Sequence, residues 1–188
     1  MNRNGSLVGA LIVAAGLLSF GARAHAAAPP ASTTSQGLGF RGLGARIGFV
    51  DPEGASSTVD LGFHIDAGEF VQHVHIVPLV EYWKVGASGV DVSDLMIGSD
   101  VNVDFPVEGG RLTPYAGGGL GLHFVKADAP PGFPAGGSSD TKLGLNIQGG
   151  IKNQMMPNLG IFGEVKYNFV SDRNQLKILG GFTYNFIY

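Results

Sequence analysis

The chain of 188 residues contains no cysteine, which excludes a disulfide framework, a thiolate metal site and a cysteine nucleophile. Charge is also scarce, because 14% of the residues are charged compared with about 25% in an average soluble domain. Lys and Arg form no cluster and the formal net charge is −3, so we expect no nucleic-acid binding. The length leaves room for one domain with short tails.

The N-terminus carries an apolar run that is too short for a membrane-spanning helix. The run covers residues 7–20, whereas a spanning helix needs about 20 apolar residues. Arg3 precedes it, and a tract of small residues that includes Arg23 follows it. This order is typical of a secretory signal peptide, with cleavage near Ala26. The expected divisions are a signal peptide at residues 1–26, a flexible leader at 27–37 and one domain at 38–188.

Alternation of apolar and polar residues with period two dominates the rest of the chain. In residues 58–67, for example, apolar residues occupy the odd positions and polar residues or glycine the even ones. A pleated strand places two such sets on opposite faces. Residues 73–84 show the weakest pattern, because Val77 and Leu79 fall on the polar side. The eight alternating segments are residues 42–49, 58–67, 73–84, 94–105, 112–124, 141–151, 159–169 and 176–186.

Turn-rich connections between these segments predict hairpins that join eight antiparallel strands. The fold class expected is therefore all-β, as a closed up-and-down β-barrel. An even number of strands places both chain ends on one side, which we assign to the periplasm. The expected outer loops are residues 50–57, 85–92, 126–140 and 171–174, and the expected periplasmic turns are 68–72, 106–111 and 152–158.

The apolar face of each strand is expected to contact lipid, and the polar face to line the interior. A soluble exterior would carry roughly 25–35% charged residues, and the polar face here is rich in glycine, which suits a narrow interior. Because unpaired backbone groups cost several kcal/mol in hydrocarbon, such a sheet has to close. Aromatic residues near the strand ends are typical of interfacial girdles: Phe49, Tyr82, Phe105, Phe124, Tyr167, Phe169, Tyr184 and Phe186.

The C-terminal segment adds a more specific signal. Within LGGFTYNF, Gly181, Tyr184 and Phe186 match the glycine and aromatic positions of the terminal strand of bacterial outer-membrane proteins. With residues 114–121 and 158–167, this segment resembles the small porin-like outer-membrane β-barrel family. The resemblance implies a bacterial outer-membrane location and insertion by the barrel assembly machinery after transport by periplasmic chaperones. We expect a monomer in contact with outer-membrane lipid.

An eight-stranded barrel has an interior only wide enough for its own side chains. A buried network of ion pairs and hydrogen bonds is the favoured interpretation of its polar residues. The alternative is a narrow porin-like channel that prefers cations, because glycines reduce bulk on this face and acids outnumber bases. The expected lumenal residues are Arg46, Asp60, His64, Asp66, His75, Glu81, Asp94, Asp100, Asp104, His123, Lys142, Glu164, Lys166 and Lys177.

His64 and Asp66 on one segment, with His73 and His75 on the next, form the one local cluster. Pairing of residue 64 with 75 and of residue 66 with 73 would place these side chains on one face. Imidazoles and a carboxylate together could bind Zn²⁺ or Ni²⁺. A hydrogen-bonded cluster is the favoured interpretation, so we predict no metal and no cofactor.

Two further function classes need different features. A lipid-modifying enzyme would need a serine beside a histidine on the lipid side, whereas the histidines are expected inside, so we predict no catalytic residue. A surface adhesin or ligand-binding barrel would act through its outer loops. Residues 126–140 are the longest of these and contain Phe133 as their only large apolar residue. The preferred function is a structural or surface role.

Overall fold

The structure is a computed structural model that describes residues 37–87, 90–108, 111–128, 137–171 and 173–186. The predicted signal peptide, nearly all of the leader and Phe133 lie outside these residues. No helix in the described part of the chain is long and apolar enough to cross a membrane. The strands are β1 (Gly37–Pro52), β2 (Thr58–Val71), β3 (Val74–Ala87), β4 (Val90–Asp104), β5 (Leu112–Asp128), β6 (Ser138–Met156), β7 (Leu159–Val170) and β8 (Gln175–Asn185).

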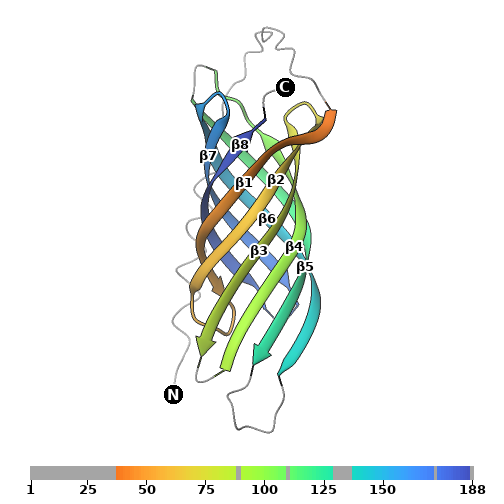
Figure 1. The fold of residues 1–188 in the computed structure, drawn as a ribbon, viewed down its shortest axis with the longest axis vertical. Coiled ribbons are helices and arrows are strands. Elements are labelled where there is room, and N and C mark those ends of the chain that lie inside the picture. Colours follow the sequence, from red (N-terminus) through yellow and green to blue (C-terminus); the bar gives the residue numbers. More distant parts are fainter. Residues whose placement is uncertain (1–36, 88–89, 109–110, 129–136, 172, 187–188) are drawn as a thin grey trace, which may run out of the picture. The chain divides into compact units, whose positions relative to one another are not determined.

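Each strand pairs in antiparallel fashion with the next, and β1 pairs with β8 to close the barrel (Figure 1). The closing register runs from Gly42 opposite Asn185 to Pro52 opposite Gln175. Closure gives every strand two neighbours, which is what a sheet in hydrocarbon requires. The predicted all-β, closed, eight-stranded barrel is therefore confirmed.

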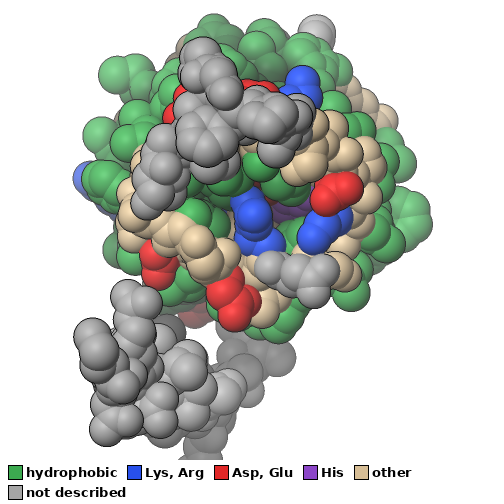
Figure 2. Space-filling view, turned by 90° about the horizontal axis from the view of Figure 1, so that it is seen from below, with side chains coloured by type: hydrophobic (Ala, Val, Ile, Leu, Met, Phe, Trp, Pro, Cys, Tyr) green, Lys and Arg blue, Asp and Glu red, His purple; other side chains and the backbone are tan. Residues whose placement is uncertain are grey.

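The two faces of the sheet differ as the alternation predicts. On β6, Leu143, Leu145 and Ile147 are each about 60% exposed, whereas the intervening Gly144 and Asn146 are buried. Figure 2 looks along the barrel and shows hydrophobic side chains around the outside, with charged and polar atoms towards the centre. The apolar side chains therefore face outwards, as the surface of a barrel surrounded by lipid requires.

The barrel has a terminal end, at which β1 starts and β8 stops, and an opposite end, the loop end. Several strands reach further towards the loop end than the alternation predicts. The residues concerned are 50–52, 85–87, 90–92, 126–128 and 138–140, which were expected in loops. The second strand likewise extends to Val71 and the sixth to Met156 at the terminal end. At the loop end the inner face carries buried apolar residues such as Val50 and Val85, so the contrast between the two faces that marks a strand in the sequence is lost there.

Glycine on the inner face lets the closing strands approach each other. A Cβ added at Gly48 would collide with the main-chain carbonyl of Ile178 on β8. Gly181 is limited in the same way, by the carbonyl of Ala45 and the ring of Phe162. A Cβ at Gly163, in contrast, would meet no atom within 4 Å. The glycine-rich face thus belongs to a narrow interior.

Candidate functional site

The interior of the barrel contains three layers along its axis. At the loop end, Val50, Trp83 and Val85 form a buried apolar cluster, against which Ala55 and Val92 pack. Charged side chains fill the middle, and a cavity lies at the terminal end. Together, the three layers determine what the interior can do.

The middle layer is a network of ion pairs contributed by most of the strands. Lys177 on β8 places its Nζ 2.6 Å from both Asp60 Oδ2 and Glu81 Oε2. Lys166 on β7 lies 2.7 Å from Asp100 Oδ2 and 3.4 Å from Glu81 Oε1. All five residues have at most 1% of their surface exposed. Charges removed from water to this degree are stable only when paired.

Arg46 extends this network towards the terminal end. Its Nη1 lies 3.1 Å from Glu81 Oε1 and 3.4 Å from Glu164 Oε1. The hydroxyl of Tyr115 donates a hydrogen bond of 2.8 Å to Glu164 Oε2, and the Arg46 guanidinium lies over the ring of Phe162 at 5.4 Å. Three cations and four carboxylates therefore share one buried network.

A smaller hydrogen-bonded group lies beside this network and includes Trp83 of the apolar cluster. His123 Nδ1 lies 2.8 Å from Asp94 Oδ2. Gln175 donates from its amide to the same Asp94 oxygen at 2.7 Å, and Trp83 Nε1 donates to Gln175 Oε1 at 3.3 Å. Trp83 thus belongs to the apolar cluster through its ring and to this smaller hydrogen-bonded group through its N–H.

At the terminal end, the predicted pairing of residue 64 with 75 is wrong. His64 lies opposite Leu79, and His75 lies opposite Glu69. The turn between β2 and β3 lies at residues 72–73, further along the chain than the predicted pairing requires, and β2 contains a bulge between His64 and Glu69. Gly68 within it adopts a φ of 85°, as bulges with glycine in the left-handed region do. His73 has a φ of 65° and occupies the tight turn between β2 and β3. It therefore does not lie on a strand beside His64, Asp66 and His75, as the predicted cluster required.

The bulge brings an additional acid to His75. Glu69 Oε1 and Asp104 Oδ2 each lie 3.4 Å from His75 Nε2, and Asp66 Oδ1 lies 3.5 Å from Nδ1. Lys152 Nζ lies 2.6 Å from the same Asp104 oxygen. The described residues contain no group of three or more His, Cys, Asp and Glu side chains arranged to hold a metal ion.

The structure distributes the predicted lumenal residues over several groups. Seven meet in the middle network, and Asp94 and His123 pair beside it. Asp66, His75 and Asp104 meet near the terminal end, and His64 Nε2 lies 2.8 Å from Thr183 Oγ1. Lys142 donates to the carbonyl of Ser171 at the loop end, at 2.9 Å. The seven are Arg46, Asp60, Glu81, Asp100, Glu164, Lys166 and Lys177.

Sequence reasoning missed several contributors to the interior, among them Glu69, Trp83, Lys152 and Gln175. Trp83 shares the odd positions of its segment with Glu81, and Lys152 shares the even positions of β6 with Asn146, so continued alternation could have identified both. Gln175 lies just outside the predicted segment. Glu69 could not have been found by parity, because the bulge reverses parity after Gly68.

Gly181, Tyr184 and Phe186, which match the terminal-strand signal for assembly into the outer membrane, lie near the end of β8. Tyr184 is exposed on the outer face, whereas Gly181 lies on the inner face beside Phe162. Phe186 stacks on Phe40 with ring centroids 5.0 Å apart, and its ring meets that of Tyr184 edge to face. Aromatic side chains therefore cover the closing seam at the terminal end.

A closed barrel with a lipid-compatible outer face and a polar, side-chain-filled interior is an integral outer-membrane β-barrel protein. Residues 67–186 match the family described as "Opacity family porin protein". The match spans more than half of the chain, so the chain belongs to that family. The predicted family resemblance and the location in the bacterial outer membrane are thereby confirmed.

Solved structures show the same fold at low sequence identity. Neisserial surface protein A is 19% identical with a TM-score of 0.65, over 80% of this chain and 100% of that chain. Ail of Yersinia pestis is 17% identical with a TM-score of 0.53, over 78% and 99%. The N-terminal β-barrel domain of Pseudomonas aeruginosa OprF is 14% identical with a TM-score of 0.54, over 79% and 99%. No curated protein sequence matches the chain.

Proposed function

We propose that the protein is a non-conducting outer-membrane barrel whose role lies in the loops that it presents at the cell surface. The blocked interior is the observation that carries this function. Trp83 and its apolar neighbours close the loop end, and Lys166 and Lys177 lie in the ion-paired layer behind them with at most 1% exposure. Side chains this deeply buried obstruct the lumen at two successive levels.

The orientation of the barrel follows from its ends. In this proposal the terminal end faces the periplasm, and the long β3–β4 and β5–β6 hairpins extend outwards from the membrane. Exposed polar residues on these extensions, such as Lys126, Asp128 and Ser139, suit an aqueous surface. One similar structure is an attachment invasion locus protein, a name that supports a surface-contact role here.

The same arrangement supports a role without catalysis. His64, His75 and His123 are at least partly buried inside the barrel, and His73 lies in a turn. The strands in the described part of the chain therefore place no histidine on the lipid side, where a lipid-modifying enzyme would need one. Since one chain closes the barrel by itself, a monomer inserted with the help of chaperones and the assembly machinery suffices.

Single-channel recording in planar lipid bilayers tests the blocked interior. Refolded protein is expected to give no conductance steps in concentrated KCl, because the apolar cluster and the buried ion pairs both obstruct the lumen. A large porin in the same bilayers serves as the positive control. Reproducible steps that favour K⁺ over Cl⁻ would contradict this proposal and support the cation-preferring channel instead.

Replacement of residues 129–136 by a Gly/Ser linker of equal length tests the role of the loops. The barrel is expected to fold as before, whereas adhesion of bacteria that display it to cultured host cells is lost. Replacement of residues 106–108 at the terminal end is the matched control and is expected to change nothing. Adhesion that survives the loop replacement would contradict a function carried by this loop.

A further inference from the structure

All three hairpins at the terminal end carry large apolar side chains at their tips. Phe70 and Val71 belong to the β2–β3 hairpin, Val107 to the β4–β5 hairpin, and Met155 and Met156 to the β6–β7 hairpin. Each of these side chains is more than half exposed. Turns in water are normally built from small and polar residues, whereas a larger exposed apolar surface marks contact with a protein or a membrane.

The apolar residues surround the terminal end instead of forming a patch on one side. In the closed barrel, the hairpins after β2, β4 and β6 follow one another at steps of two strands around the circumference. The closing seam occupies the fourth step, where Leu38 is exposed and Phe40 stacks on Phe186. The described residues of the β1–β2 and β7–β8 connections at the loop end, 53–57, 171 and 173–174, include no large apolar side chain. The apolar ring is therefore a feature of the terminal end.

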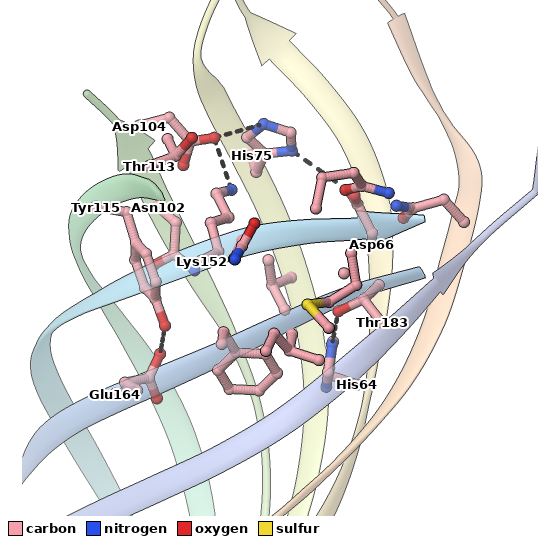
Figure 3. Close-up of a pocket in the computed structure, with 18 of the residues that line it drawn as sticks. His64, Asp66, His75, Asn102, Asp104, Thr113, Tyr115, Lys152, Glu164 and Thr183 are labelled. Carbon is pink, nitrogen blue, oxygen red and sulfur yellow. Dashed lines mark hydrogen bonds and ion pairs between the residues drawn. The ribbon is translucent and has the colours of Figure 1, made fainter. Parts of the chain in front are cut away.

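The centre of the same end is polar. In the cavity that lies there, Asp104 Oδ2 is 3.4 Å from His75 Nε2 and 2.6 Å from Lys152 Nζ (Figure 3). Charged groups thus line the interior, and apolar side chains surround them. A protein that covered the whole end would bury these charges together with the ring, which is costly. A lipid leaflet contacts the circumference alone and leaves the polar centre in water.

We propose that the hairpins at the terminal end are embedded in the membrane, at the boundary between the headgroups and the acyl chains of the adjacent leaflet. The ring continues the lipid-facing surface of the strands, because Val103, Phe105 and Leu112 extend that surface along β4 and β5 to Val107. Glu108 is the next residue and is exposed, and a charged group at this depth reaches water among the headgroups. The leaflet is the periplasmic one in the orientation proposed for the barrel, on which this detail rests.

The two ends of the barrel then differ in how far they project from the membrane. At the loop end, Lys126 and Asp128 follow Phe124 on the outer face of β5 and are exposed, so the sheet continues into water there. At the terminal end, the apolar surface continues to the turns themselves. The protein therefore projects from the membrane at the loop end alone, and the embedded ring fixes the depth of the barrel in the membrane.

Spin labelling tests this placement directly, because a cysteine introduced into this chain is its only thiol. Val107→Cys and Met156→Cys carry a nitroxide at the terminal end, and Ser56→Cys and Ser171→Cys carry it at exposed positions of the loop end. Ile147→Cys is the reference for the lipid-covered middle of the barrel. Each variant is refolded into vesicles of phosphatidylethanolamine and phosphatidylglycerol. Electron paramagnetic resonance then measures collisions of the label with oxygen, which concentrates in lipid, and with a water-soluble nickel chelate.

The ratio of oxygen to nickel collisions is expected to be several-fold higher for the two terminal-end labels than for the two loop-end labels, and highest at residue 147. The comparison holds for either direction of insertion into the vesicles. Equal ratios at both ends would overturn the proposal and leave the membrane assignment intact as long as residue 147 is in lipid, whereas a water-exposed residue 147 would overturn both.

Dipolar broadening between terminal-end labels would also overturn the proposal, since a second copy of the chain would then cover the hairpins. Faster gel migration before heating shows that each labelled variant is folded. Phe70→Cys replaces a terminal-end variant that fails this check, because Phe70 is exposed in the β2–β3 hairpin.

Discussion

Lys177→Met is expected to lower the free energy of unfolding by about 3–5 kcal/mol, as removal of one partner from a buried ion pair does. Lys177 Nζ lies 2.6 Å from Asp60 and from Glu81. Without it, Asp60 has no other ion pair among the described residues, and two cations face four carboxylates. Because the site is about 1% exposed, water cannot compensate for this loss.

The measurement is chemical unfolding in detergent, followed by the fluorescence of Trp83. This is the chain's single tryptophan, and it is 1% exposed, so unfolding changes its environment. Lys126→Met removes the same group from an exposed position and is expected to have an effect within about 0.5 kcal/mol. Lys177→Met combined with Asp60→Asn is expected to regain part of the lost stability, because the unpaired charge is gone. Equal stability of the two methionine variants would contradict a coupled buried network.

The strands were predictable because the contrast between lipid outside and a polar interior determines the residues on both faces of the sheet. Residues between lipid and a narrow polar interior must alternate, and β2 and β6 show this over most of their length. The lumenal acids and bases follow from the same parity, since a charge cannot face hydrocarbon. For that reason Glu81, Lys166 and Lys177 could be assigned to the interior without knowledge of their partners.

Other features depend on geometry that parity does not encode. The bulge before Glu69 shifts the register of β2 against β3, and the sequence marks it only by Gly68. The apolar cluster at the loop end contradicts a uniformly polar interior, because Val50 and Trp83 occupy inner positions. Which lumenal residues pair with one another depends on strand tilt, as the contact between Arg46 and Glu164 on β1 and β7 illustrates.

Ile147→Arg is expected to destabilise the barrel in lipid vesicles by about 2–4 kcal/mol, the cost of Arg on a lipid-facing strand near the bilayer centre. Ile147 is 58% exposed in the middle of β6, with Gly118 and Tyr167 opposite it on the two neighbouring strands. If lipid covers this position, the guanidinium loses its hydration there. Chemical unfolding of the protein in vesicles measures the difference.

Thr141→Arg is the matched control, because Thr141 lies on the same face of β6 near the loop end and is also exposed. There the cost falls to about 0–1 kcal/mol, since Arg near the interface keeps its contact with water. A surface in contact with water everywhere would give two equally small effects. The expected contrast requires lipid around the middle of the barrel. Equal effects of the two substitutions would contradict the assignment of the outer face to lipid.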